Sequence, residues 1–139
     1  MAADGLDDAE IIDILRQTRR IALVGASANA ERPSHGVMRF LLAHAFSVTP
    51  VNPGLAGQEI LGQAVVPDLA AAQPLDMVDI FRAPAHVGPV VEAAIRFGAR
   101  TIWMQLGVMN EPAAASARAA GLRVVMDRCP AIEWARLMS

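Results

Sequence analysis

Hydrophobic residues along the chain fall into two patterns that alternate from one end to the other. Short continuous apolar runs indicate strands buried on both faces, whereas apolar residues three or four positions apart indicate amphipathic helices. The clearest run is residues 21–24, which stops at Gly25. The clearest helical repeat consists of Val87, Val90, Val91, Ala94 and Ile95. The chain is therefore predicted to alternate strands with helices.

The same patterns predict the other elements. Further strands are expected at residues 47–51, 76–81, 101–105 and 122–126, and further helices at residues 112–120 and 131–138. Residues 1–19 should contain a helix capped by Asp7, with Glu10 three positions later. Pro33 suits the first turn of another helix, whose buried face would carry Val37, Phe40 and Leu41. Between residues 55 and 74 the pattern is weak, and we expect a short edge strand at 64–66 and a short helix at 68–72.

This alternation predicts a three-layer, Rossmann-like α/β fold, with a parallel sheet of five to six strands and helices on both faces. The length of 139 residues fits one domain, residues 1–139, with a hydrophobic core that needs no disulfide or metal. Ligands of such sheets bind beyond the carboxyl ends of the strands. The loops after residues 24, 51, 81, 104 and 126 are therefore the candidate binding segments.

Composition narrows the chemistry. The formal net charge of −2 argues against a nucleic-acid partner, and all 12 basic residues are arginine, which excludes lysine-based Schiff-base or P-loop chemistry. Cys129 has no second cysteine to pair with, the N-terminal residues do not resemble a secretory signal, and no apolar run is long enough to span a membrane. We therefore expect a cytoplasmic protein that has no membrane partner. The alanine-rich and apolar surfaces leave room for a homodimer without specifying one.

The loop between residues 25 and 34 lies where a helix N-terminus presents free N–H groups to phosphate. Gly25 permits a tight turn, Ser27 offers a hydroxyl and Arg32 adds positive charge, although an ordinary polar loop with a capping serine fits equally well. A nicotinamide dinucleotide would favour G-x-G-x-x-G here and an acidic residue after the second strand, and both are missing. The histidines lack metal-ligand spacing. His35 lies near the phosphate loop, where it could contact a ligand, but we expect it to be an exposed residue at the start of a helix.

Charged residues near the strands are expected to be structural. Asp76 and Asp79 lie three apart on one strand and so face opposite sides, which excludes a carboxylate pair. Arg128 is expected to pair with Asp127 or with Glu133.

Six segments, in order, resemble the stand-alone bacterial CoA-binding domain proteins: IALVGAS, RPSHGVMRFL, VTPVNP, DMVDIFR, IWMQLGV and VVMDRCPAIE. Those proteins are in turn similar to the N-terminal domain of the succinyl-CoA synthetase alpha subunit. The resemblance covers residues 21 to about 137. It implies a Rossmann-like fold with coenzyme A, or an acyl-CoA, as its ligand.

The resemblance also implies a set of ligand contacts. The turn that meets the CoA phosphates corresponds to Gly25, Ala26, Ser27 and Ala28, with Arg32 and Ser34 close behind. The loop beside the nucleotide corresponds to Asn52 and Pro53, and Arg82 and Pro84 form a further wall. The pantetheine path corresponds to Met104, Gln105 and Leu106, and Cys129 stands at its thiol end. Gly54 departs from the lysine that relatives often carry, which removes one phosphate contact.

In the synthetase, chemistry requires a second domain with a phosphorylated histidine and a partner subunit. Neither is found in this sequence, so the resemblance implies CoA binding without complete catalytic machinery. Two alternatives remain open at this point, an NAD-dependent oxidoreductase and an interaction domain without a ligand. Cys129 also has two interpretations, as a packing residue beneath the last helix or as a thiol that forms a reversible mixed disulfide with CoA.

Overall fold

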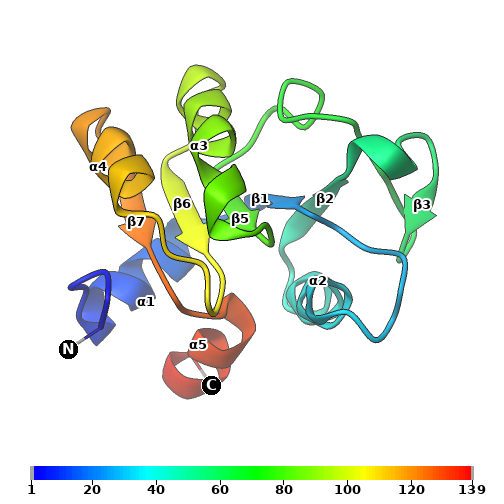
Figure 1. Ribbon diagram of the computed structural model, residues 1–139. Coiled ribbons are helices and arrows are strands. Elements are labelled where there is room, and N and C mark those ends of the chain that lie inside the picture. Colours follow the sequence, from blue (N-terminus) through cyan, green and yellow to red (C-terminus); the bar gives the residue numbers. More distant parts are fainter. Residues whose placement is uncertain (1, 139) are drawn as a thin grey trace.

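A computed structural model describes residues 2–138, and it has the alternating order that the sequence predicts (Figure 1). The helices are α1 (Asp8–Gln17), α2 (Pro33–Ala43), α3 (Val87–Arg96), α4 (Glu111–Ala119) and α5 (Pro130–Leu137). The long-sheet strands are β1 (Arg20–Val24), β2 (Ser47–Val51), β5 (Met77–Ile80), β6 (Thr101–Met104) and β7 (Arg123–Val125). A small hairpin consists of β3 (Glu59–Ile60) and β4 (Gln63–Ala64), and short 3-10 turns cover Pro53–Leu55 and Pro84–His86.

The five long-sheet strands are all parallel and lie in the order β2-β1-β5-β6-β7. The predicted Rossmann-like α/β fold is confirmed, with five strands in its sheet. The chain moves outward from β1 to β2 and then returns to place β5 on the other side of β1. The strand order therefore reverses between β1 and β5, which is where such sheets open a crevice for ligands.

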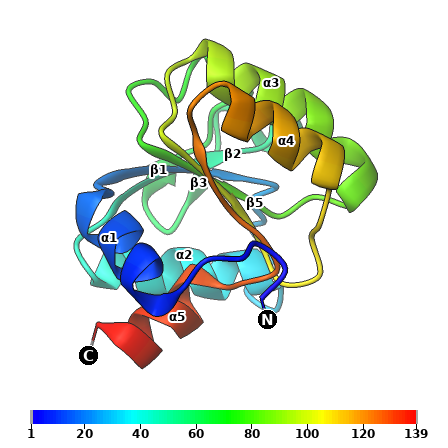
Figure 2. The same ribbon diagram turned by 90° about the vertical axis from the view of Figure 1, so that its left-hand side faces the viewer.

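Helices cover both faces of the sheet (Figure 2), with α3 and α4 on one face and α1, α2 and α5 on the other. Two hydrophobic clusters fill the spaces between these layers. Side chains of β5 alternate between the faces, so Val78 and Ile80 lie in the α3–α4 cluster while Met77 lies in the other. Asp79 shares the face of Met77.

The N-terminal helix has the predicted cap. The Asp7 carboxylate accepts a hydrogen bond from the Glu10 backbone N–H at 2.9 Å, and the Glu10 carboxylate accepts one from the Asp7 N–H at 3.2 Å. Ile11 and Ile14 are buried against the sheet. These two bonds satisfy N–H groups that the helix itself leaves free.

Two predictions for residues 55–74 are wrong in detail. The expected strand at 64–66 is reduced to β4 and a single bridge between Val66 and Val51, so the long sheet gains no sixth strand. The expected helix at 68–72 is a turn, in which the Asp68 carboxylate accepts a hydrogen bond from the Ala71 N–H at 3.0 Å. A segment this short gains too few helical hydrogen bonds to offset the cost of the first turn, so a side-chain bond to the backbone prevails.

β5 begins one residue later than predicted, so Asp76 lies just before the strand. One of its carboxylate oxygens accepts hydrogen bonds from the N–H groups of Arg19 and Arg20, at 3.0 and 2.9 Å. Burial of this carboxyl raises its pKa, but the two backbone bonds and the nearby arginines outweigh burial and hold the pKa below its ordinary value. The structural role expected for Asp76 is therefore observed. No helix among residues 2–138 is both long enough and apolar enough to cross a membrane.

Candidate functional site

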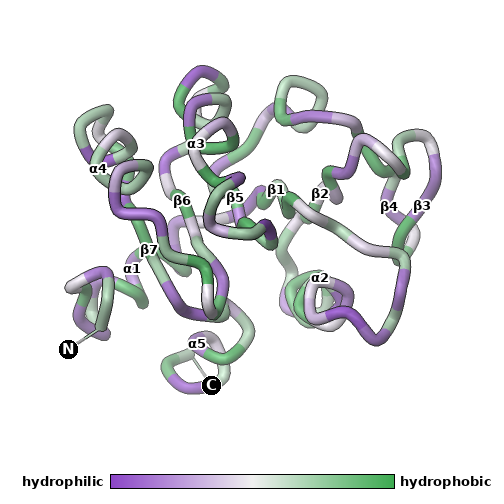
Figure 3. The backbone as a smooth tube through the Cα atoms, in the orientation of Figure 1, coloured by the Kyte–Doolittle hydropathy of each residue, from purple (hydrophilic) through white to green (hydrophobic). Residues whose placement is uncertain are grey.

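A pocket of about 790 Å³ opens at the carboxyl edge of the sheet, beside the point where the strand order reverses. We call it the first pocket. Its walls come from four parts of the chain, namely the loop between β1 and α2, the loop after β2, the segment around Leu69, and α3 with the end of β5. The loop that leads into α2 is hydrophilic along its tip (Figure 3), in contrast with the strand that precedes it.

Gly25 makes the sharp turn at the end of β1. Its φ is +88°, a conformation that side chains other than glycine rarely adopt, and its N–H donates to the Val51 carbonyl at 3.1 Å. A Cβ at this position would lie 2.2 Å from the backbone oxygen of Phe81. The loops after β1 and β5 therefore approach as closely as they do because residue 25 has no side chain.

Asn52 holds the loops after β1 and β2 together. Its Nδ2 donates to the Ala26 carbonyl at 2.8 Å, and its Oδ1 accepts from the Gly54 N–H at 2.9 Å. The side chain lines the first pocket, but both of its polar atoms are used to position backbone. This bracing role was not foreseen, because the sequence indicates only that Asn52 follows a strand.

The start of α2 is free of side-chain caps. Arg32 is the N-cap residue without a capping bond, and the first turn carries no acidic residue. Ser27 does not cap the helix either, since its Oγ accepts from the Asn29 N–H at 3.1 Å within the loop. The positive end of the helix therefore faces the first pocket without an acidic residue in its own first turn, and Arg32 and the buried Ser34 line the same space.

A second pocket, of about 610 Å³, adjoins the first. It lies between α2, α5 and the loops after β6 and β7, and its lining includes Gln105, Leu106 and Cys129. Pro33 and Phe81 line both pockets and so form their common boundary. The structure thus places the predicted phosphate turn in one pocket and most of the predicted pantetheine path in its neighbour.

Most predicted site residues line one of the two pockets. The first pocket includes Gly25, Ala26, Ser27, Arg32, Ser34, Asn52, Pro53 and Arg82. Three predicted residues line neither pocket. Met104 is fully buried against α3 and α4, because alternation along β6 turns it to the other face from its neighbours Trp103 and Gln105. Ala28 and Pro84 are exposed beside the first pocket.

Other lining residues were missed by sequence reasoning. Leu69, Val90 and Ala93 line the first pocket from the segment with the weak pattern and from α3. The helical repeat assigns Val90 to the core, and the only signal for a second role is that α3 follows a strand next to the crevice. For Leu69 the sequence carries no such signal.

His35 is buried, with 8% of its surface exposed, so its prediction as an exposed residue is wrong. Ser34 and His35 are both buried in the first turn of α2, so the position of this turn buries the ring despite its polarity. Its Nδ1 has no hydrogen-bond partner within the described part of the chain. Gln105 Oε1 and both oxygens of Asp79 are likewise buried and unpartnered. Burial raises the pKa of Asp79 well above its ordinary value, because an ionised carboxylate there would have no compensating partner.

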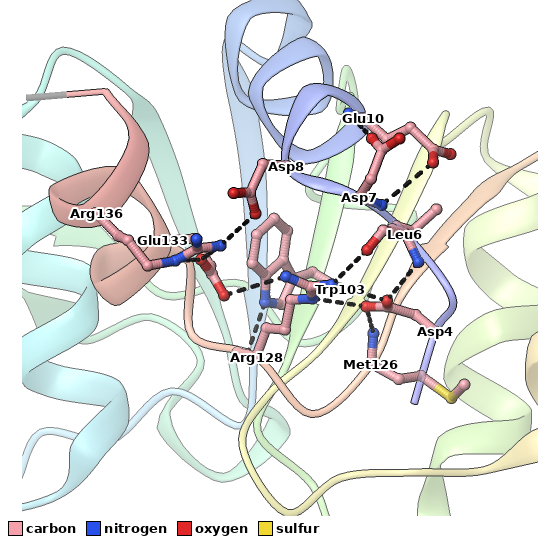
Figure 4. A network of polar contacts seen from close by, with 10 residues as sticks. All are labelled: Asp4, Leu6, Asp7, Asp8, Glu10, Trp103, Met126, Arg128, Glu133 and Arg136. Carbon is pink, nitrogen blue, oxygen red and sulfur yellow. Dashed lines mark hydrogen bonds and ion pairs between the residues drawn. The ribbon is translucent and has the colours of Figure 1, made fainter. Parts of the chain in front are cut away.

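Arg128 anchors the loop after β7, which carries Cys129 (Figure 4). Its guanidinium donates to both Asp4 oxygens, at 2.9 and 3.0 Å, and to Glu133 at 3.3 Å. The predicted pairing with Glu133 is observed, but the one with Asp127 is not, since the Asp127 carboxylate accepts instead from the Gly107 N–H at 2.8 Å. Burial of Asp4 raises its pKa, and the bonds from Arg128 and from two backbone N–H groups outweigh that effect and lower it overall. The loop below the second pocket is therefore held from both ends of the chain.

These features define a class, the parallel α/β proteins whose first strand ends in a glycine turn that leads to an uncapped helix N-terminus at the carboxyl edge of the sheet. Residues 19–135 match the family model described as CoA binding domain, and the chain belongs to that family.

The chain is also similar to known proteins over most of its length. The Bacillus subtilis protein YneT, described as uncharacterized, is 35% identical over 122 residues, which cover 87% of this chain and 89% of YneT. A solved structure of a hypothetical protein from Pyrococcus horikoshii OT3 is 38% identical, with a TM-score of 0.95 over 100% of this chain and 97% of that one. The dinucleotide-forming acetyl-coenzyme A synthetase 1 of Ca. Korarchaeum cryptofilum shares the fold, with a TM-score of 0.71 at 21% identity. The match covers 84% of this chain and 28% of the synthetase chain.

Proposed function

We propose that this protein binds coenzyme A non-covalently, with the nucleotide in the first pocket and the pantetheine arm directed into the second. The observation that carries the proposal is the coincidence of the family match with the site: the matched residues 19–135 contain every segment that lines the two pockets. The pockets adjoin at Pro33 and Phe81, which suits a ligand that has a compact nucleotide and a long arm.

The phosphates of CoA fit the start of α2. Backbone N–H groups of the first turn are left without a side-chain cap, and Gly25 lets the preceding loop approach closely. The lysine that relatives often carry after the proline is replaced by Gly54, so Arg32 and Arg82 are the cationic side chains that line the pocket. We infer that Arg32 contributes the main charge-assisted contact, since it directly precedes the helix.

We further propose that the protein binds CoA without catalysing a reaction of its own. Apart from its two arginines, the first pocket offers the hydroxyls of Ser27 and Ser34, the bracing amide of Asn52 and the carboxylate of Asp68. The Ser27 hydroxyl already takes part in a turn of its own loop. These groups are suited to holding a nucleotide, and they support a carrier or sensor of CoA in preference to an enzyme.

Calorimetric titration with CoA, NAD and ATP tests the proposal. We expect CoA to bind most tightly and NAD to bind weakly, because β2 is followed by Asn52, whose amide is engaged, and not by an acidic residue that would bind ribose hydroxyls. Tighter binding of NAD than of CoA would overturn the proposal. Binding of neither would favour an interaction domain, and native mass spectrometry of the same sample would show whether the chain is a monomer or a homodimer.

The variant Arg32→Ala locates the phosphates. Loss of one charge-assisted hydrogen bond should cost about 1.5–3 kcal/mol, which corresponds to a CoA dissociation constant about 10- to 150-fold higher. Arg39→Ala is the matched control, because Arg39 lies exposed on the same helix and lines neither pocket. Equal dissociation constants for the two variants would mean that the phosphates bind elsewhere.

A further inference from the structure

The second pocket is uncharged throughout. Its lining consists of proline, glycine, valine, phenylalanine, leucine, alanine and isoleucine residues together with Gln105 and Cys129. Leu106 and Ile132, which are 56% and 54% exposed, lie on its wall. They are the two most exposed of the large hydrophobic side chains among residues 2–138. Exposed apolar side chains gathered on one hollow indicate a site for an apolar ligand.

Gln105 places a buried polar side chain in the wall of the second pocket. The side chain is 5% exposed, and its Oε1 has no hydrogen-bond partner among the described residues. A buried acceptor without a donor is costly, so a bound ligand that brings an N–H group to it gains affinity. The last amide N–H of the pantetheine arm is such a donor, and only two carbons separate it from the sulfur.

We propose that the second pocket holds the acyl chain of an acyl-CoA thioester, so that the ligand of this protein is an acyl-CoA with an uncharged, apolar acyl group. The proposal rests on the proposed function, because the acyl chain would enter the second pocket attached to a CoA whose nucleotide is bound in the first pocket. With the amide at Gln105, the sulfur and the acyl group lie beyond it, among Val37, Ile132 and their neighbours. No charged side chain of the described residues lines this space, so an acyl group that ends in a carboxylate would lose its hydration without gaining a partner.

A matched series of ligands tests this inference by calorimetry. We expect affinity to rise from CoA through acetyl-CoA and butyryl-CoA to hexanoyl-CoA, by at most about fourfold for each methylene that becomes fully buried. Butyryl-CoA and succinyl-CoA have acyl chains of equal length, and succinyl-CoA should bind more weakly because of its terminal carboxylate. Equal affinities for CoA and hexanoyl-CoA, or for butyryl-CoA and succinyl-CoA, would overturn the inference.

The variant Gly36→Leu fills the second pocket from one wall. Gly36 lies on α2 in a helical conformation, and a Cβ built on it meets no atom within 4 Å, so the larger side chain can be accommodated. We expect the ratio of hexanoyl-CoA affinity to CoA affinity to fall to near one. The control Ala43→Leu adds the same side chain to an exposed site on the same helix, away from both pockets, and should keep the wild-type ratio.

The outcomes separate this inference from the function on which it rests. Binding of CoA by the wild-type protein without a dependence on acyl length would overturn the acyl site and leave CoA binding in place. A wild-type ratio in Gly36→Leu would also overturn it, because the pocket would then not be where the chain binds. Binding of no CoA species at all would overturn both.

Discussion

The turn at Gly25 allows a prediction whose magnitude can be worked out from the structure. In Gly25→Ala the new Cβ faces two penalties, a φ of +88° and a distance of 2.2 Å to the Phe81 backbone oxygen. The backbone conformation should cost about 1–2 kcal/mol. The clash involves backbone, which cannot rotate away as a side chain can, and overpacking of this kind costs about 1–3 kcal/mol more. We therefore expect the free energy of unfolding to fall by about 2–5 kcal/mol.

Two other glycines separate the contributions. Gly57 has a φ of +89° but open space around its Cβ position, so Gly57→Ala should show the backbone penalty alone, about 1–2 kcal/mol. Gly36 is helical and open, so Gly36→Ala should stabilise the protein by about 0.5–1 kcal/mol. The three substitutions make the same chemical change in three different environments.

Urea unfolding of the three variants and the wild type, followed by circular dichroism, measures these differences. If Gly25→Ala costs no more than Gly57→Ala, the close approach of the two loops is not a constraint on stability and the reasoning is refuted. Calorimetry adds an independent readout, because relief of the clash must separate the loops after β1 and β5 and so weaken CoA binding. Gly57 lines neither pocket, and Gly57→Ala should keep the wild-type affinity.

Two further predictions concern buried groups. Burial raises the pKa of Asp79 well above its value in the unfolded chain, so the protonated carboxyl favours the folded state. This contribution to the free energy of unfolding is fully present below about pH 4. It is lost as the pH rises through the folded pKa, by up to about 1.4 kcal/mol per pH unit. Asp79→Asn should therefore gain in free energy of unfolding relative to the wild type as the pH is raised, and parallel pH profiles of the two proteins would contradict this. Cys129 is 6% exposed, and the charge of Arg128 is already paired with Asp4 and Glu133, so little favours a reactive thiolate. We therefore expect intact-mass analysis to find no adduct on native protein treated with CoA disulfide, and to find one only after denaturation. An adduct of one CoA on the native protein, absent from Cys129→Ser, would show instead that exchange at this thiol releases free CoA and leaves a mixed disulfide.

Local patterns of the sequence determined the order of elements. Continuous apolar runs specify parallel strands buried on both faces, and repeats such as the one in α3 specify helices that cover them. The capping box at Asp7 is likewise local, because it depends on residues within one turn of chain. The alternation alone predicts the fold class and the edge of the sheet at which the candidate site lies, because parallel connections leave few other arrangements.

The tertiary structure alone decided how distant groups combine. Asp4 and Arg128 are 124 positions apart, and their pairing depends on where the two ends of the chain lie on one face of the sheet. Gln105 and Met104 are adjacent in sequence, yet one lines a pocket and the other is buried on the opposite face, because the side-chain direction reverses at each residue of a strand. His35 is buried for a similar reason, since the angle at which α2 meets the sheet is set by packing between layers. Patterns along the chain record which face of an element is apolar, whereas the meeting of faces from different elements depends on three-dimensional packing that no local pattern contains.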